Sequence, residues 1–145
     1  MQKKNGRSVV VLLRFRAWLK KRQEMDNEIN HISWLEDELY CIGDGITYMV
    51  SAEDLVLMQS TGLRDELNEE LFEGDVILWT YWDEFEDSGR AKIVFKEGMF
   101  KLLDVRTGEE VWDNLFDCIE NCNVYLQGNI YENPELLEEK KWTQK

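Results

Sequence analysis

The stretch LFEGDVILWTYW, residues 71–82, decides the fold of this chain. An acidic turn with one glycine runs into residues 76–82, of which six in seven are aliphatic or aromatic. Alternate residues of a strand point to opposite faces, and here both faces are apolar. The stretch therefore predicts a strand that is covered on both sides. Either it forms part of a packed barrel wall, or its rings form an exposed stacking platform for a ligand.

The charge around this stretch favours the barrel wall. Residues 65–87 contain ten acidic residues and no Lys or Arg. Stacking platforms for single-stranded nucleic acid normally lie among cationic side chains. We therefore expect the nearby rings to be mostly core, each contributing about 2 kcal/mol or more on burial. These rings are Trp79, Tyr81, Trp82, Phe95 and Phe100.

The composition is that of one soluble globular domain. The chain has 145 residues, 43% of them hydrophobic and 32% charged, and a domain of this length buries roughly 70% of the surface that its unfolded chain exposes. No apolar run approaches the 18 or so residues that cross a bilayer. The apolar run 9–13 is too short for a signal peptide and meets Arg14. We expect a cytoplasmic protein with no membrane association.

The net charge of −13 is spread unevenly. Residues 1–22 hold eight basic residues and no acidic ones, which leaves nine basic and thirty acidic residues (−21) in the remainder. One interpretation is a basic arm that contacts phosphates. The other is an N-terminal strand whose basic face is neutralised by the acidic body of the same chain. We favour the second, because a strongly anionic body repels nucleic acid over most of its surface.

The residue types that usually carry catalysis are scarce or uninformative. His31 is the single histidine, no Gly-x-Ser-x-Gly elbow is present, and the glycines at 43–45 are too few to cradle phosphates. Among thirty acidic residues, an adjacent pair such as Asp83 and Glu84 carries no information. An odd number of cysteines predicts buried thiols rather than disulfides; they are Cys41, Cys118 and Cys122. We predict no enzyme, and no catalytic, cofactor-binding or metal-binding residues.

Most of the remaining chain predicts short strands. Residues 8–18 alternate as a half-buried strand does, with Leu13, Phe15 and Ala17 on one face and Arg14, Arg16 and Trp18 on the other. Glycines at 43 and 45 indicate a hairpin. Further strands are expected at 29–34, with His31 on the solvent side, and at 55–62, 91–95, 98–103, 109–112 and 123–131. Polar turns are expected at 19–28 and 64–75, and a loop at 83–91.

Short helical segments complete the pattern. Asp113 is placed to cap a helix at 114–120, where Leu115, Phe116 and Ile119 have helical spacing. Asn133 and Pro134 are placed to begin a C-terminal helix, and Ser51 a single turn. Strands that recur every 8 to 12 residues indicate a sandwich or barrel. We predict a mainly β fold, a small barrel-like domain with a short helix before the last strand and a C-terminal helical turn.

Three stretches in order carry a family resemblance: RFRAW (14–18), LMQSTGLRDELNEELFEGDVI (57–77) and GNIYENPELL (128–137). Together they resemble the YopX family, small proteins encoded by phages and prophages of low-GC Gram-positive bacteria. The resemblance covers residues 13–138 and implies a mainly β barrel fold with no known activity. Family members commonly have an Asp where this chain has Leu19, and Asn-Gly where it has Asn68 and Glu69.

The resemblance divides the chain and marks its motif positions. Residues 1–12 are expected to be a basic N-terminal extension and the start of the first strand, 13–138 a single YopX-like β domain, and 139–145 a polar C-terminal tail. Gly62 and Gly74 suit backbone positions that a Cβ would strain, and Gly128 suits a bulge. We expect the motif positions to be structural; they are Phe15, Arg16, Ala17, Trp18, Thr61, Gly62, Leu63, Asp65, Glu73, Gly74, Asp75, Gly128, Asn129, Ile130, Tyr131, Glu132, Asn133 and Pro134.

These observations lead to two hypotheses about function. The first is a non-enzymatic, phage-encoded interaction module that binds a host or phage protein through its acidic surface. The alternative is a nucleic-acid-binding β-barrel that uses the basic N-terminal strand and exposed aromatic rings. Neither needs a cofactor, and self-association into a homo-oligomer stays open.

Overall fold

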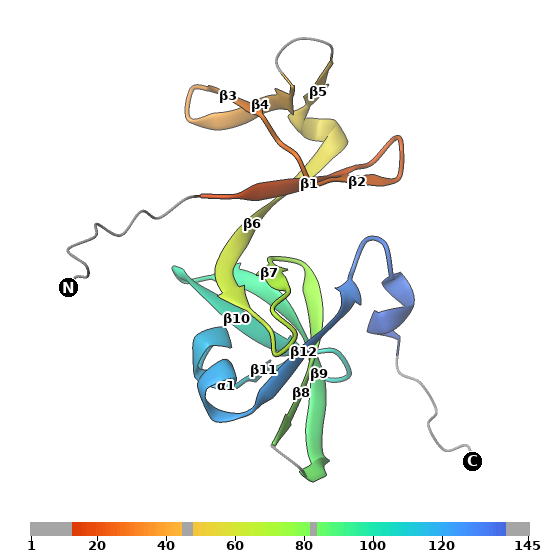
Figure 1. Ribbon diagram of the computed structural model, residues 1–145. Helices are drawn as coiled ribbons and strands as arrows, with labels where there is room; N and C mark the ends of the chain where they lie inside the picture. Colours follow the sequence, from red (N-terminus) through yellow and green to blue (C-terminus); the bar gives the residue numbers. More distant parts are fainter. Residues whose placement is uncertain (1–12, 45–47, 82–83, 139–145) are drawn as a thin grey trace, which may run out of the picture.

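The computed structural model describes residues 13–44, 48–81 and 84–138, which fold mainly into strands (Figure 1). The strands are β1 Phe15–Leu19, β2 Glu24–Asp26, β3 His31–Leu35, β4 Glu38–Gly43, β5 Met49–Ser51, β6 Leu55–Arg64, β7 Glu70–Phe72, β8 Asp75–Tyr81, β9 Glu84–Lys96, β10 Met99–Asp104, β11 Glu110–Val111 and β12 Asn123–Asn129. The helical segments are η1 Ala52–Asp54, α1 Leu115–Asn121 and η2 Pro134–Leu137. The predicted mainly β, barrel-like fold, with a short helix before the last strand, is confirmed.

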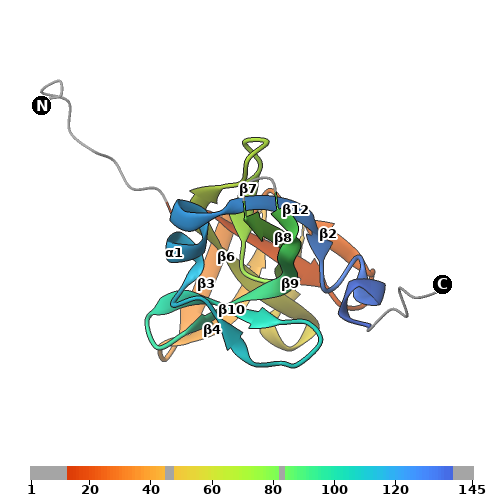
Figure 2. The same ribbon diagram turned by 90° about the horizontal axis from the view of Figure 1, so that it is seen from below.

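In the described part of the chain, antiparallel strands form three sheets. Their orders are β2-β1-β6-β7, β11-β10-β9-β8-β12 and β3-β4-β5. The five-stranded sheet lies in the half of the molecule that is lower in Figure 1 and curls around the interior of that half. Helix α1 lies at one side of it (Figure 2). Strand β6 is long enough to pair with two strands in turn. Residues 55–59 pair with β1, and Ser60 and Arg64 pair with β7.

The molecule has two lobes that meet at β1 (Figure 1). We call β1–β5 and the first half of β6 the N-terminal lobe, and the rest, through η2, the barrel lobe. The core of the N-terminal lobe is built on Ala17, Leu19, Ile42 and Leu55. The core of the barrel lobe is built mainly on aliphatic side chains, with two thiols; its members are Leu71, Ile77, Ala91, Ile93, Leu102, Leu115, Cys118, Cys122 and Val124.

Strand β1 is covered on both faces, which corrects the prediction of a half-buried strand. The predicted alternation is right: Ala17 and Leu19 pack into the core of the N-terminal lobe, while Arg16 and Trp18 point to the opposite face. That second face contacts the barrel lobe, so Arg16 is buried rather than solvated. Residues 8–12 of the predicted strand lie outside the described residues.

The loop predicted at 83–91 is wrong for its described part, because residues 84–91 belong to β9. Gly89 pairs with Trp79 of β8, and a Cβ on Gly89 would lie 3.0 Å from the indole. Gly89 therefore makes room for a ring on the neighbouring strand. The short strands β2 and β7 also replace parts of predicted polar turns, at 19–28 and 64–75.

The aromatic rings are less buried than predicted. Trp79 and Phe100 are partly buried and pack against the barrel-lobe core, but Tyr81 and Phe95 are exposed. Trp79 contacts the rings of Tyr81 and Trp112 edge-on, at centroid distances of 6.0 and 5.5 Å. The prediction of mostly core rings therefore holds only in part, and Trp82 lies outside the described residues.

The helix caps also differ from expectation. Asn114, not Asp113, caps α1, because its side chain accepts a hydrogen bond from the Asp117 amide at 2.8 Å. Within α1 Leu115 is buried, whereas Phe116 is exposed. At η2 the Asn133 side chain does not cap the helix and instead accepts from the Asn129 amide at 3.2 Å.

One carboxylate closes the curled sheet. Asp65 is buried, and its Oδ1 accepts from the amides of Leu67 and Glu69 at 2.9 and 2.8 Å. Its Oδ2 accepts from the Leu126 amide of β12 at 2.8 Å, beside a backbone bond from Glu66 to Val124. The turn after β6 thereby occupies the edge of β12, so that this edge does not stay open.

Asp65→Ala should lower the free energy of unfolding by about 3 kcal/mol, because buried amides lose their acceptor. The adjacent exposed Glu66→Ala should change it by less than about 0.5 kcal/mol. Urea unfolding followed by tryptophan fluorescence measures both. Equal stabilities of the two variants would contradict the role of Asp65 in closing the sheet.

Candidate functional site

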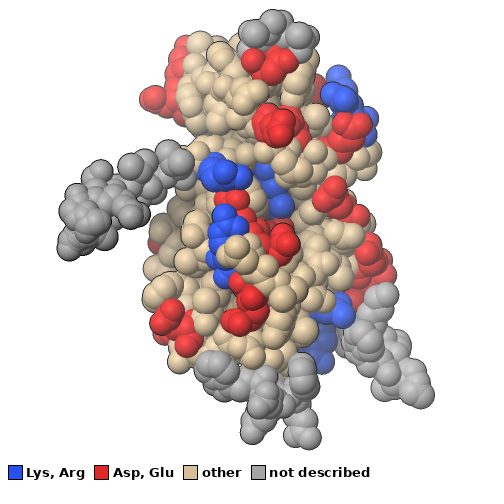
Figure 3. Space-filling model, viewed as in Figure 1, with Lys and Arg blue, Asp and Glu red and all other residues tan. Residues whose placement is uncertain are grey.

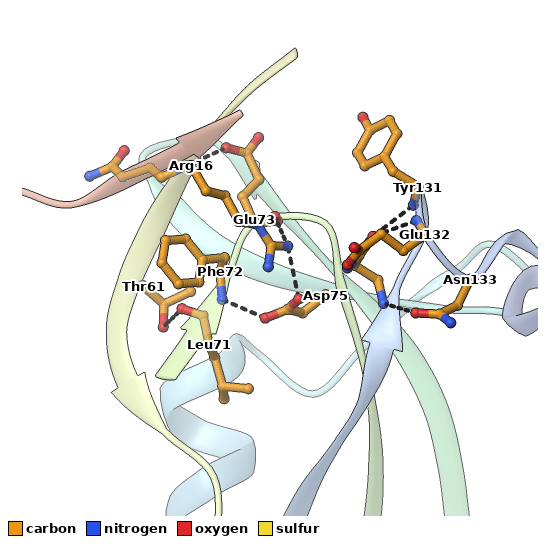
Figure 4. Close-up of polar contacts among 11 residues, drawn as sticks. Arg16, Thr61, Leu71, Phe72, Glu73, Asp75, Tyr131, Glu132 and Asn133 are labelled. Atoms are coloured by element: carbon orange, nitrogen blue, oxygen red, sulfur yellow. Dashed lines mark hydrogen bonds and ion pairs between the residues drawn. The ribbon is translucent and has the colours of Figure 1, made fainter. Parts of the chain in front are cut away.

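Many of the motif residues come together where the two lobes meet (Figure 4). Arg16 reaches this junction from β1, Glu73 and Asp75 from the turn into β8, and Tyr131 from the segment after β12. We call this cluster the junction. It contains an ion pair between two buried side chains, and it is therefore the first place to look for chemistry.

A buried ion pair lies at the centre of the junction. Arg16 Nη2 is 2.8 Å from Asp75 Oδ1, and only 8% and 2% of the two side chains are exposed. Nη2 also donates to the Glu73 carbonyl at 3.2 Å, and the guanidinium lies 4.7 Å from the centroid of the Phe72 ring. Asp75 Oδ2 accepts from the Phe72 amide at 2.7 Å. Burial raises the pKa of the Asp75 carboxyl, and the Arg16 charge opposes that rise.

The glycine turn beside the pair is packed on all sides. Gly74 has a φ of +91°, and a Cβ there would lie 2.9 Å from Met58 Sδ. Its amide donates to the Ile93 carbonyl at 2.8 Å, and its carbonyl accepts from the Ile130 amide at 3.0 Å. Only glycine fits both this backbone conformation and this space.

The closing motif folds on its own side chains. Asn129 Oδ1 accepts from the amides of Tyr131 and Glu132 at 3.0 and 2.8 Å, and Asn129 Nδ2 donates to Glu132 Oε1 at 2.7 Å. The register of β12 shifts between Leu126 and Gly128, so Gly128 lies at the irregularity that the sequence indicated. The Tyr131 ring stacks on Trp18 at 5.8 Å, which links this motif to β1.

The other motif positions lie outside the Arg16–Asp75 pair. Thr61 Oγ1 donates to the Leu71 carbonyl at 2.8 Å and accepts from the Leu63 amide at 3.0 Å. Gly62 has a φ of +79° on the surface of β6. The remaining positions are apolar or begin η2; they are Phe15, Ala17, Ile130 and Pro134. The polar side chains of the motifs thus bond mainly to other groups of the same chain, many of them within the motifs.

The other residues that could carry chemistry are the cysteines and His31. Cys118 and Cys122 are buried with their sulfurs 3.4 Å apart, and burial raises the pKa of both thiols. Exposed His31 pairs with the Ser33 hydroxyl at 2.6 Å. Within the described ranges, no group of three or more His, Cys, Asp or Glu side chains is placed to hold a metal ion.

The basic residues at 14–22 are all bound by the same chain. Besides Arg16, three form ion pairs: Arg14 with Glu70 at 3.1 Å, Lys21 with Asp54 at 3.5 Å and Arg22 with Glu24 at 3.2 Å. Lys20 donates to the Glu53 carbonyl at 3.2 Å. Figure 3 shows basic (blue) and acidic (red) side chains next to one another where the two lobes meet. For these residues the acidic body neutralises the basic strand, while Lys3, Lys4 and Arg7 lie outside the described residues.

The β3–β4 hairpin forms an exposed surface that was not expected from the sequence. Trp34, Leu35 and Tyr40 are each 58% exposed, and Glu36, Asp37 and Glu38 lie between them. Glu36 and Asp37 both have positive φ, as a two-residue hairpin turn requires. The segment WLEDELY could have indicated this surface, because three acids separate large apolar residues. We call residues 34–40 the acidic–aromatic hairpin; it projects at the outer end of the N-terminal lobe (Figure 1).

Fold and junction define a small two-lobed antiparallel β protein whose lobes are joined by a buried ion pair. The sequence profile described as YopX protein matches residues 14–138, and the chain therefore belongs to the YopX family. No curated protein sequence matches it.

Two solved structures are similar to the chain. One is protein EF1440 from Enterococcus faecalis, with 26% identity and a TM-score of 0.64 over 89% of this chain and 100% of that one. The other is protein yopX from Bacillus subtilis, with 20% identity and a TM-score of 0.62 over 88% of this chain and 97% of that one. Both similarities support the fold described above. Among the described residues, no helix is long and apolar enough to cross a membrane.

Arg16→Met should lower the free energy of unfolding by about 3–5 kcal/mol, because it leaves the Asp75 carboxylate buried without a counter-ion. The double variant Arg16→Met/Asp75→Leu should recover most of that loss, because neither charge remains. Urea unfolding measures both variants. A single variant that loses less than about 1 kcal/mol would contradict the importance of the pair.

The stability of Arg16→Met should also depend on pH in a defined direction. Without Arg16 the effect of burial is opposed less, mainly by the Phe72 amide, so the folded-state pKa of Asp75 rises further above its unfolded value. The folded state then binds the proton more tightly, and stability falls as pH rises through the folded-state pKa. From pH 7 to pH 5 the variant should gain stability relative to the parent chain. The double variant should show no such gain, and a gain there would contradict the assignment to Asp75.

Proposed function

We propose that this protein is a non-enzymatic, protein-binding module whose contact surface is the acidic–aromatic hairpin. The exposure of Trp34, Leu35 and Tyr40 beside three acids is the observation that carries the proposal. Large apolar side chains that gather on the surface of a small protein indicate a contact site. Tryptophan and tyrosine contribute most of the binding energy at many protein interfaces.

The acids define the chemistry of the partner. Glu36, Asp37 and Glu38 are exposed at the tip of the hairpin. A surface that combines apolar pockets with Lys or Arg complements this tip in both shape and charge. The net charge of −13 adds a long-range attraction for such a partner. The proposed partner is accordingly a basic protein of the host or of a phage, met in the bacterial cytoplasm, in line with the phage and prophage setting that the family resemblance implies.

Two observations support this proposal over the alternatives. The described cations at 14–22 are bound by acids or carbonyls of the same chain, which leaves them poorly suited to phosphates. The polar side chains of the family motifs bond mainly to one another, which supports a structural role rather than a catalytic one.

Trp34→Ser/Tyr40→Ser should reduce retention of a partner from bacterial lysate by about tenfold or more at about 50 mM salt. Leu67→Ser is the matched control, because Leu67 is similarly exposed but lies on the barrel lobe. It should retain the partner as the parent chain does. Quantitative mass spectrometry of the captured proteins measures both effects.

Equal retention by the hairpin variant and the parent chain would contradict the proposed surface. A gel-shift assay with single-stranded DNA at about 50 mM salt, where phosphate contacts are strong, should show no shift. A shift would instead favour the nucleic-acid-binding alternative.

A further inference from the structure

An open groove of about 700 Å³ lies beside the first half of β1. One wall is formed by residues 13–15, and the other by residues 27–32, which lead from β2 into β3. The groove belongs to the N-terminal lobe but lies at the opposite end of β3 from the acidic–aromatic hairpin.

The direction of the β1 main-chain groups follows from its bonds to β6. The Ser60 amide donates to the Arg14 carbonyl at 2.8 Å, and the Lys20 amide donates to the Asp54 carbonyl at 2.9 Å. In an antiparallel ladder, alternate residues bond to the same neighbour. The main-chain groups of even-numbered residues 14–20 therefore face β6. Those of odd-numbered residues 13–19 face the other side, toward β2.

Strand β2 covers only part of that side. It pairs with β1 from Leu19 to Ala17, where it reaches Asp26. Continued pairing would place Glu28 opposite Phe15, but the Glu28 amide donates to Asp26 Oδ1 at 3.0 Å and the chain leaves the ladder. Among residues 13–44, 48–81 and 84–138, the N–H and C=O groups of Leu13 and Phe15 that face the groove have no hydrogen-bond partner.

We infer that this groove binds an extended segment of a partner protein, which adds to β1 as a strand beyond the end of β2. Unpaired main-chain groups at a strand edge are a template for another strand. Side chains of Phe15, Ile29 and Ile32 are partly buried along the groove and offer apolar contacts to alternate residues of the added segment. The strand addition itself does not depend on the proposed function.

The charges around the groove define the segment further. Glu28 is exposed, while the Arg14 charge is already paired with Glu70 at 3.1 Å. The acids of the hairpin, Glu36 to Glu38, follow the far end of β3. The segment is therefore one in which apolar and basic residues alternate, and the sign of this charge rests on the proposed function.

A labelled decapeptide of alternating Val and Lys is the probe, and fluorescence anisotropy measures its binding. Leu13 is 68% exposed, so Leu13→Pro removes an edge N–H with little effect on packing. Leu13→Ala removes a similar side chain and keeps the N–H, which makes it the matched control. Leu13→Ala should bind within about twofold of the parent chain, and Leu13→Pro about fivefold or more weakly, as the loss of a hydrogen bond implies.

Two further measurements test the mode of binding. A decapeptide N-methylated at alternate residues cannot donate hydrogen bonds from one of its two edges, so it should not bind to β1 through that edge. When the unmethylated peptide binds, hydrogen exchange should show new protection of the Leu13 and Phe15 amides. The inference is overturned if the parent chain does not bind the Val–Lys peptide at a concentration of about 1 mM, which is high enough to populate even a weak complex. It is also overturned if the two Leu13 variants bind equally, or if both amides stay unprotected.

The outcomes separate this inference from the proposed function. Trp34→Ser/Tyr40→Ser should keep its binding of the Val–Lys peptide in the groove. If this variant binds the peptide and also captures the partner as the parent chain does, only the proposed contact surface fails, and the groove inference stands. A Val–Glu decapeptide that binds as tightly as the Val–Lys one would overturn the assignment of a basic segment.

Discussion

Arg16 and Asp75 are drawn together from positions 59 residues apart, and each is almost completely removed from water. A buried charge without its counter-ion destabilises a small protein by several kcal/mol, so the lobes can dock only in an arrangement that brings these two groups together. The neighbouring glycine turn and the Trp18–Tyr131 stack fit the same arrangement. The ion pair therefore specifies how the lobes are joined, while the two apolar cores supply most of the stabilisation.

The junction also shows what many polar residues of the family motifs bond to. The side chains of Asn129 and Asp75 accept hydrogen bonds from main-chain amides, and Arg16 donates one to a main-chain carbonyl. Each such bond fixes a turn that has no strand partner of its own. The side chains that serve this purpose, Arg16, Asp75 and Asn129, are buried and bonded inside the molecule.

Local periodicity predicted the elements whose structure depends on neighbours in sequence. The alternation along β1 and β8 and the glycines of the hairpins were sufficient for most strands and for the barrel-like class. The first half of β9 could not be predicted this way, because Gly89 is a strand residue only when Trp79 lies across from it. Likewise, the burial of Arg16 depends on Asp75, which no local pattern relates to it. The exposure of Trp34 depends on where the N-terminal lobe ends, which is a property of the tertiary structure.

The two lobes treat their sheet edges differently, and this difference bears on function. In the barrel lobe, the carboxylate of Asp65 and the amide of Glu66 bond to the outer edge of β12. In the N-terminal lobe, β2 ends at Asp26, and the edge of β1 at Phe15 is left beside a groove. An unpaired edge is an aggregation risk that proteins usually cover. Among the described residues, one edge is closed by a dedicated buried side chain and another is left open next to a groove. This is the arrangement expected of an edge that pairs with a partner.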